Sequence, residues 1–299
     1  MNRVLITGGN GFLGSNLTRF FLKKDYKVMV ISRSSINLTD ILESIEFVKH
    51  LDPGYLQFTN QIKTFLPTVV IHCAWDGANA YKDLNNLNQI KNITQSTELL
   101  QVLITLSIKP VFVGVGTFSE YGLMNSLTNE TTPDFPINLY GLTKSSFKNI
   151  SNMICDQNNI RWIWVRPCLI YGQYDVSTRL IPTLIRKLHA GENVILDSCN
   201  TIVDYLHVED FCNGVFMFIQ SSSGIVNLSS GKEQPVRLLI EYIQKEIGNS
   251  TVTFDSTRDR INVSKYSGGN SDKLKSWGWK PSIDIYDGLR ELIQKTKHM

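Results

Sequence analysis

The chain has 299 residues, of which 42% are hydrophobic and 19% charged, and its net charge is +3 at pH 7. This composition belongs to a globular protein with room for one large domain or two moderate ones, and it excludes disordered and fibrous chains. The charge is spread without long runs of Lys or Arg, so we expect no nucleic-acid partner. No apolar stretch reaches the roughly 18 residues of a membrane span, so we expect no membrane association.

The five cysteines are odd in number and include no Cys-x-x-Cys pair, so they predict neither a disulfide framework nor a metal site. The N-terminus leads directly into a strand-like run, without the basic and apolar parts of a signal peptide. Both features favour a reducing, cytoplasmic location.

Short β-branched runs alternate with longer amphipathic segments through the first half of the chain. This alternation is typical of a Rossmann-type α/β fold, in which helices cover both faces of a doubly wound parallel sheet. The predicted strands are 3–7, 27–32, 68–72, 110–115 and 161–167, and the predicted helices are about 14–24, 88–106 and 140–156.

A glycine-rich loop follows the first strand and opens the first helix. Gly8, Gly11 and Gly14 stand three apart, and Gly9-x-Gly11-x-x-Gly14 also fits the dinucleotide fingerprint. Such a loop lets backbone N–H groups approach a pyrophosphate at the positive end of the helix, although a plain glycine-rich turn remains the alternative. The predicted cofactor contacts in this loop are Gly8, Asn10, Gly11, Phe12, Leu13 and Gly14.

The second strand ends in Ser32-Arg33-Ser34, where an acidic residue is expected to bind the adenosine ribose of NAD. Arg33 can instead pair with a 2′-phosphate, and Ser32 and Ser34 can donate hydrogen bonds to it. We therefore predict NADP(H) as the cofactor, with NAD(H) as the alternative if Arg33 is only a solvated charge at the strand end.

Tyr140 and Lys144 lie four residues apart at the start of a predicted helix, which places both side chains on one face. A neighbouring ammonium would lower the pKa of the tyrosine from its usual value near 10, as a carbonyl reduction requires. Thr117 follows a strand that ends at about residue 115, so it lies at the carboxyl edge of the sheet, where open α/β folds bind ligands. Without the tyrosine and lysine, Thr117 would be interpreted as a turn or helix-start residue.

The regular alternation breaks after about Tyr171. We predict a dinucleotide-binding domain over residues 1–171 and a smaller, mostly helical substrate lobe over 172–299. Within the lobe, Arg179 to Gly191 is typical of a helix closed by a C-terminal glycine.

With these elements in place, the chain resembles the extended short-chain dehydrogenase/reductases, and among them the NAD(P)-dependent sugar-nucleotide epimerases, dehydratases and reductases. The resemblance covers nearly the whole chain and rests on several motifs in the family's order. It implies that Thr117, Tyr140 and Lys144 are catalytic, that Tyr140 and Lys144 also contact the cofactor, and that Ala74 and Pro167 line its channel. It also implies a homodimer formed through the helices at 88–106 and 140–156. The motifs are TGGNGFLG, VVIHCA, GTFSEYG, YGLTK, VRPCLIYG, RLIPTLI, DYLHVED and WGWKP.

Departures from the family pattern narrow the expected reaction. Family dehydratases carry Thr-Asp-Glu where this chain has Thr117-Phe118-Ser119, so the acid and base that remove water are missing. The family's epimerase-reductases that make fucose nucleotides use a Cys and a His at positions occupied here by Ser119 and Arg179. The expected activity is therefore reduction of the C4 ketone of a nucleotide-linked 4-keto-6-deoxy or dideoxy sugar. The alternative is a 4-epimerase. A non-catalytic NADP(H)-binding regulatory protein is a third possibility, because fold alone does not exclude it.

The substrate side departs further from the family. The Arg that usually precedes DYLHVED, and that contacts the nucleotide diphosphate, is Val203 here, and the usual Asn after the Arg-Pro pair is Leu169. We therefore take Arg179 as a candidate substrate contact, and Arg258 or Arg260 as a candidate for the missing phosphate contact, with a solvated surface Arg as the alternative.

Overall fold

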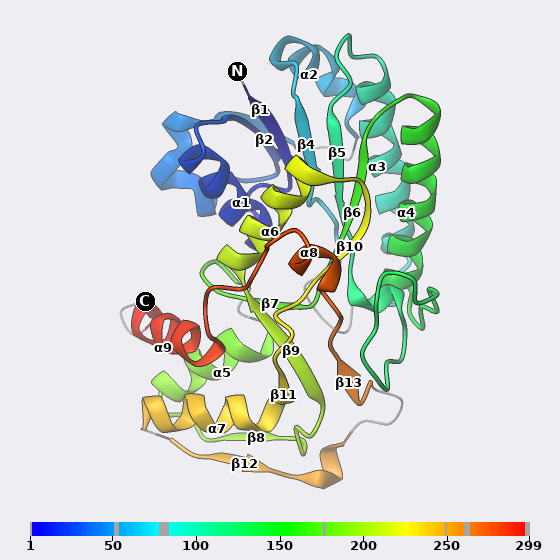
Figure 1. The fold of residues 1–299 in the computed structure, drawn as a ribbon. Helices are drawn as coiled ribbons and strands as arrows, with labels where there is room; N and C mark the ends of the chain where they lie inside the picture. The colour runs from blue at the N-terminus through cyan, green and yellow to red at the C-terminus, as the bar shows by residue number, and fades with distance from the viewer. Residues whose placement is uncertain are drawn as a thin grey trace.

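The computed structural model describes residues 2–50, 54–77, 84–175, 178–248, 250–259 and 264–296. Its centre is a seven-stranded parallel sheet in the order β10-β6-β5-β4-β1-β2-β3, which confirms the predicted Rossmann-type α/β fold (Figure 1). The strands are β1 (Arg3–Thr7), β2 (Lys27–Ser32), β3 (Glu46–Lys49), β4 (Val69–His72), β5 (Val111–Val115), β6 (Trp162–Pro167) and β10 (Gly224–Leu228).

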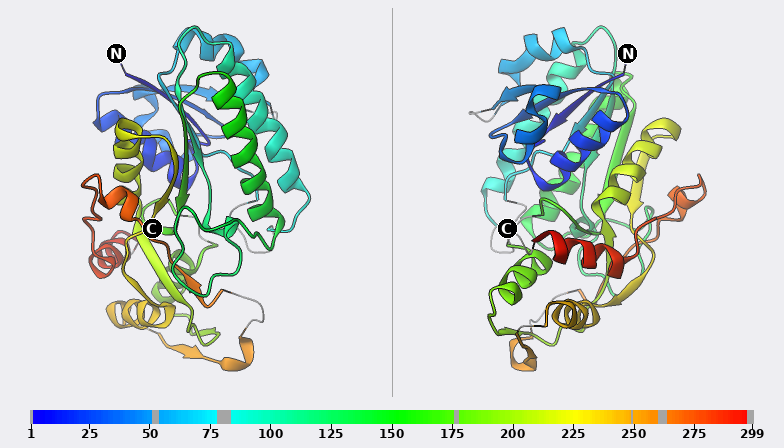
Figure 2. Two further views of the ribbon diagram at one scale, coloured as in Figure 1. Left: turned by 45° about the vertical axis from the view of Figure 1, so that its right-hand side comes forward. Right: turned by 90° about the vertical axis from the view of Figure 1, so that its left-hand side faces the viewer.

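Helices cover both faces of this sheet, because the apolar residues of the central strands alternate between two cores. Val4 and Ile6 of β1 pack in the core that also contains residues of α1 and α6, whereas Leu5 packs in the core on the side of α3 and α4. The two helix pairs lie on opposite faces in Figures 1 and 2. These helices and their neighbours are α1 (Phe12–Lys23), α2 (Thr59–Phe65), α3 (Asn88–Ile104), α4 (Leu139–Gln157) and α6 (Val208–Ser221), with the 3-10 turns η1 (Ile36–Ser44), η2 (Leu56–Phe58) and η4 (Phe118–Glu120).

A smaller region below the sheet has its own apolar core. In it, β9 pairs with β7, β11 and β13, and β8 pairs with β12. The region is therefore built on small sheets as well as helices. Its elements are β7 (Leu169–Tyr171), α5 (Leu180–His189), β8 (Val194–Leu196), β9 (Ile202–His207), β11 (Glu233–Pro235), α7 (Val236–Ile247), β12 (Val252–Phe254), η5 (Ser256–Arg258), β13 (Tyr266–Ser267), α8 (Asp272–Lys275) and α9 (Ile285–Thr296).

The chain crosses between the two regions more than once. After residue 171 it enters the smaller region, but α6 then packs against α1, and β10 pairs along its length with β6 at the edge of the large sheet. The predicted division at residue 171 stays a prediction about domains, and residues 208–228, which lie beyond it, belong with the large sheet.

Of the helices in the described ranges, none combines the length and apolar character needed to cross a membrane.

Candidate active site

A cleft of about 1370 Å³ runs along the carboxyl ends of the central strands and reaches the start of α5 and the strand β9. This is the edge at which open parallel sheets bind their ligands. Among the residues predicted for the site, the structure brings the following to the walls of this one cleft: Gly8, Asn10, Gly11, Phe12, Leu13, Gly14, Ser32, Arg33, Ser34, Ala74, Thr117, Tyr140, Lys144, Pro167 and Arg179.

The glycine loop has the geometry that close approach to a phosphate requires. Gly8 has a φ of +67°, and a Cβ on it would lie 2.8 Å from the Cα of Ala74. A Cβ on Gly14 would overlap the carbonyl oxygen of Gly8. Gly11 is the N-cap of α1, and it has no side chain that could satisfy the first N–H groups of the helix. These amides therefore fit an anionic group such as a dinucleotide pyrophosphate.

Asn10 joins the glycine loop to the end of β2. Its backbone N–H donates to the Ser32 hydroxyl at 3.4 Å and its side-chain amide donates to the Ser34 hydroxyl at 2.7 Å. The backbone N–H of Asn37 donates to the Asn10 side chain at 2.8 Å. Since both serines act as acceptors in these bonds, their own hydroxyl protons can be donated to a ligand.

Arg33 does not stand alone at the strand end, because its guanidinium forms a 2.8 Å ion pair with the carboxylate of Asp76. Asp76 follows β4, two residues after Ala74, and is held by hydrogen bonds between its backbone and the side chain of Asn92. Both charged groups line the cleft and are more than half exposed. The sequence analysis did not identify Asp76; a carboxylate just after a predicted strand end was the available signal.

The catalytic candidates come from two segments that meet at the end of β5. Thr117 is the N-cap of η4 and accepts the backbone N–H of Ser119. Tyr140 and Lys144 lie in the first turns of α4, whose N-cap Asn138 accepts the N–H of Gly141 at 2.8 Å. The side chain of Thr117 lies close enough to the Tyr140 hydroxyl to oppose the rise that burial causes in the pKa of that phenol. The predicted grouping of these side chains is therefore present in the structure.

The protonation states differ from the sequence-based expectation. Burial raises the pKa of Tyr140 above its ordinary value, against the opposing effects of the Thr117 hydrogen bond and the positive charge of Arg179. Burial also lowers the pKa of Lys144 to about 7. The expected lowering of the tyrosine pKa by Lys144 is therefore not found, because both groups lie in a poorly solvated environment. Tyr140 is a protonated phenol at neutral pH.

Lys144 is held by groups that the sequence analysis did not include. Its ammonium donates to the carbonyl of Val115 at 2.6 Å and lies 3.9 Å from the ring centroid of Trp75. The Trp75 indole N–H in turn donates to Gln89 at 2.8 Å. A carbonyl and a π face both favour a cation, so they hold the lysine in the cleft wall without a neighbouring carboxylate in direct contact.

The two positions that carry the acid and base in family dehydratases have no carboxylate in this chain. Phe118 is buried and packs edge-on against Tyr121, and Ser119 lines the cleft. The nearby carboxylate of Glu120 is fully buried and bonded to Arg166, so it is not available as an acid or base to a ligand in the cleft.

The side of the cleft predicted to bind the substrate is lined by Arg179, Leu169 and Tyr205, among others. Arg179 is the N-cap of α5 and lies 3.6 Å from the carboxylate of Asp175. Val203 is buried in the core of the smaller region.

Arg258 lies outside the residues that line the cleft. It belongs to η5, where it contacts the carbonyl of Ile195 at 3.2 Å and the carboxylate of Asp255 at 3.5 Å. The structure therefore does not bring it to the other candidates, and Arg260 falls outside the described residues. Within the described ranges, no three His, Cys, Asp or Glu side chains are gathered in a way that could hold a metal ion.

Comparisons with known proteins identify the family of this chain. Residues 4–229 match the model of the NAD dependent epimerase/dehydratase family. A Methanocaldococcus jannaschii protein with the provisional name UDP-glucose 4-epimerase is 26% identical over 99% of this chain and 98% of its own length. CDP-abequose synthase of Salmonella typhimurium is 23% identical over 98% of this chain and 97% of its own length.

Among solved structures, the Thermus thermophilus UDP-glucose 4-epimerase in complex with NAD has a TM-score of 0.88, with 20% sequence identity and 98% of each chain covered. This likeness shows the shared fold. Since the family model covers residues 4–229, which include the sheet, the glycine loop and the candidate catalytic segments, the chain belongs to the NAD-dependent epimerase/dehydratase family of extended short-chain dehydrogenase/reductases.

Proposed function

We propose that this enzyme reduces the C4 ketone of a nucleotide-linked 4-keto-6-deoxy or dideoxy sugar with NADPH. The observation that carries the proposal is the composition of the cleft. It combines Thr117, Tyr140 and Lys144 with Arg33 at the predicted adenosine end, and it has Phe118 and Ser119 at the positions of the dehydratase acid and base. The similarity to CDP-abequose synthase over nearly the full length of both chains supports the same choice.

The residues of the cleft fit a nicotinamide dinucleotide. The glycine loop offers backbone amides to a pyrophosphate, and Arg33 with the hydroxyls of Ser32 and Ser34 suits a 2′-phosphate. The cleft volume of about 1370 Å³ exceeds that of an ordinary small-ligand pocket, as expected for a site that takes a dinucleotide and a sugar nucleotide together.

The chemistry of this chain's own residues follows from their positions. NADPH, when bound, would supply the hydride. Tyr140, kept protonated by its raised pKa, donates a proton to the C4 oxygen, and Thr117 orients that oxygen beside it. The side-chain nitrogen of Lys144, which donates to the carbonyl of Val115, lines the cleft, and Arg179 is the candidate for the charged part of the substrate.

The direct test is NADPH oxidation, followed by absorbance, with CDP-, dTDP- and GDP-linked 4-keto-6-deoxy sugars. We expect turnover with at least one of them. The variant Tyr140→Phe should lose turnover by at least about 100-fold while it binds NADPH normally. Tyr26→Phe, which removes a hydroxyl from the α1 side of the sheet, is the matched control and should keep full activity. Unchanged turnover in Tyr140→Phe would overturn the proposal.

A sugar-nucleotide 4-epimerase is the second candidate, and two observations favour it. Its name is carried by the Methanocaldococcus jannaschii relative, and Arg33 is paired with Asp76 rather than free. An epimerase must retain its cofactor, so it predicts NAD(H) that copurifies with the protein and turnover without added cofactor. A non-catalytic NADP(H)-binding regulatory protein would oxidise NADPH with none of the sugar nucleotides.

A homodimer through α3 and α4 is part of the proposal. These helices pack against each other, and α4 presents Leu142, Ile150 and Met153 to solvent. The three residues are separated by eight and three positions, a spacing that puts them on one helix face. A second copy of the chain would cover this stripe.

A further inference from the structure

The backbone of Thr117 is held by the carboxylate of Glu120, which does not line the cleft. Glu120 is completely buried, and it accepts the backbone N–H of Thr117 at 2.8 Å. The Thr117 hydroxyl accepts the N–H of Ser119 at 3.2 Å, so the two side chains form a reciprocal cap on the single turn η4. The position of the Thr117 side chain therefore depends on Glu120.

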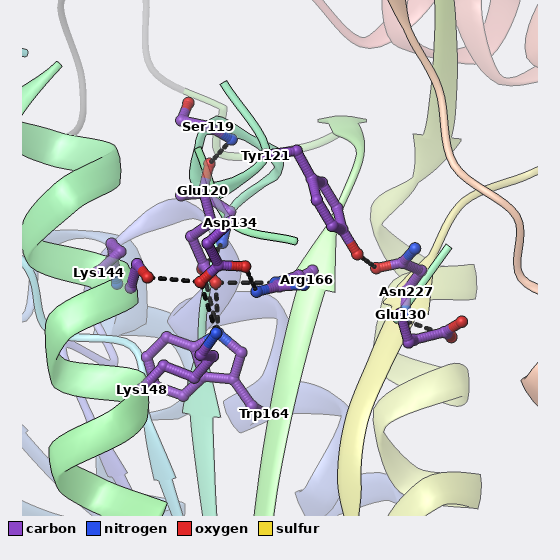
Figure 3. Close-up of polar contacts among 12 residues, drawn as sticks. Ser119, Glu120, Tyr121, Glu130, Asp134, Lys144, Lys148, Trp164, Arg166 and Asn227 are labelled. Atoms are coloured by element: carbon purple, nitrogen blue, oxygen red, sulfur yellow. Dashed lines mark hydrogen bonds and ion pairs between the residues drawn. The ribbon is translucent and has the colours of Figure 1, made fainter. Parts of the chain in front are cut away.

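The other contacts of Glu120 come from β6. The indole N–H of Trp164 lies 3.1 Å from both carboxylate oxygens, and Nε of Arg166 donates at 2.8 Å (Figure 3). A Cβ on Gly116 would overlap both the Glu120 carboxylate and the Trp164 indole, so the backbone at Gly116 leaves no room for a side chain beside these two groups. Because these partners are all donors, the carboxylate is bound in its ionised form, even though burial raises its pKa.

The same network continues to the helix that carries Tyr140 and Lys144. The Nη2 atom of Arg166 binds the Asp134 carboxylate. This carboxylate also accepts hydrogen bonds from Ser145 and Lys148 of α4. Ser145 directly follows Lys144, and Lys148 is one helical turn further. The network thus contacts the Thr117 segment at one end and α4 at the other, as Figure 3 shows.

Buried ion pairs are a costly way to stabilise a fold, since apolar side chains of similar size serve as well or better. A network of two carboxylates and two cations behind the catalytic candidates therefore points to a role in geometry. We propose that Glu120 is a positioning residue of the active site, which fixes Thr117 through its backbone and, through Arg166 and Asp134, fixes α4 relative to it. This inference rests on the proposed roles of Thr117, Tyr140 and Lys144.

A second effect of Glu120 concerns the charge on Lys144. Among the described residues, the titratable groups that interact with Lys144 are His72 of β4, Cys73 after it and Glu120 of η4, and Tyr140 lies one turn before it on its own helix. Burial lowers the pKa of His72 to about 3 and raises that of Cys73 to about 12, so both are neutral. Glu120 supplies the negative charge among them, and it opposes the loss of the Lys144 proton.

The first test measures Lys144 directly and needs no substrate. The pKa of Lys144 is followed by NMR on protein whose lysines carry ¹³C-methyl groups, with the resonance assigned from Lys144→Arg. We expect Glu120→Gln to lower this pKa. Asp134→Asn is the matched control, because it breaks the same network but removes a carboxylate that binds Ser145, Lys148 and Arg166, and its shift should be smaller.

Equal shifts in the two variants, or no shift in Glu120→Gln, would overturn the electrostatic part of the inference. If Glu120→Gln does not fold, Glu120→Asp gives the same test, because it keeps the charge but draws it away from Thr117 and Lys144. We then expect the Lys144 pKa to fall by less than the fall predicted for Glu120→Gln, and an unchanged pKa would count against the inference.

The second test uses NADPH oxidation with the best 4-keto sugar nucleotide. Glu120→Gln should reduce kcat on the order of tenfold or more with NADPH binding unchanged, because misplaced groups lose rate rather than affinity. The alkaline limb of its kcat/KM profile should also shift to lower pH, because Lys144 then loses its proton at a lower pH. A normal kcat and pH profile would refute the positioning role. Absence of turnover in the unmodified enzyme would instead refute the proposed function, and the NMR result would still decide on Glu120.

Discussion

At the residue scale, the proposed adenosine end of the cleft holds two opposed charges. Arg33 attracts a 2′-phosphate, but Asp76, 2.8 Å from it, repels one and competes for the same guanidinium. Exposed ion pairs of this kind contribute roughly 0–1 kcal/mol, so a cofactor phosphate can displace the carboxylate. We therefore expect the preference between NADPH and NADH to depend on the balance of Arg33 and Asp76.

Substitution of Asp76 or Arg33 should change the binding affinities for NADPH and NADH by different amounts. We expect Asp76→Asn to tighten NADPH binding by about fivefold, equivalent to ~1 kcal/mol, and to leave NADH binding unchanged. Arg33→Met should weaken NADPH binding by roughly 10- to 100-fold, since a hydrogen bond to a charged group is lost. Parallel fluorescence titrations with both cofactors check this, and an equal change for both cofactors in either variant would contradict it.

His72 provides a prediction about acid stability. It is buried between Thr7 and Ser96, with bonds of 2.7 and 2.8 Å, and burial lowers its pKa to about 3. The unfolded chain binds this proton near pH 6.5, so between pH 6.5 and 3 the unfolded state holds more protons and stability falls as pH falls.

The protonation of His72 in the unfolded chain lowers the free energy of unfolding by up to about 1.4 kcal/mol per pH unit. In His72→Gln, we expect a lower stability at pH 7 but a shallower fall of the unfolding free energy between pH 6 and 4. Urea denaturation over this range measures both, and parallel curves for the two proteins would show that His72 is not responsible.

At the scale of elements, the buried strands were the most predictable part. The strands at 3–7 and 27–32 have the predicted bounds, because strands covered on both faces are continuous apolar runs. β3 was not predicted, since it is an edge strand of sequence Glu-Phe-Val-Lys with no fully buried residue. β10 was not predicted either, because its partner β6 lies about 60 residues earlier and five residues carry no sign of that pairing.

The candidate site was predicted to a similar degree, and for a related reason. Glycine spacing and the Tyr140–Lys144 pair are local patterns, and the structure brings both to one cleft. Asp76, Trp75 and Glu120 approach these residues from other loops and strands, through the register of the sheet. Arg258 shows the opposite case, a suitable side chain whose segment folds elsewhere.

The junction of β1 and α1 allows a steric test within the glycine loop. In Gly14→Ala, the new Cβ meets the backbone of Gly8, which cannot rotate away, so helix and loop must separate. We expect a loss of about 1–3 kcal/mol in stability and at least tenfold weaker binding of both cofactors. Gly11→Ala is the comparison, because its Cβ meets a single atom at 3.2 Å. Denaturation and cofactor titration should rank Gly14→Ala as the more severe variant.

At the scale of the whole molecule, the exposed stripe of α4 is where two copies are expected to meet. Met153 is 64% exposed and Leu142 48% exposed, which is unusual for apolar side chains on one helix face. Met153→Lys combined with Leu142→Glu should convert a dimer into a monomer, as measured by light scattering after size exclusion. Leu238→Glu, at a similarly exposed site on α7, should leave the dimer intact. A monomeric unmodified protein would exclude this assembly.

The return of residues 208–228 to the large sheet limits how such an enzyme can be taken apart. A fragment that stops at residue 171 would leave β6 as an open sheet edge and would uncover the apolar surface beneath α6. Unpaired parallel strands invite association with other chains, so we expect this fragment to aggregate rather than to act as a free-standing nucleotide binder. Chimaeras that exchange substrate specificity should therefore keep α6 and β10 with the N-terminal part, and graft only the segments on either side of them.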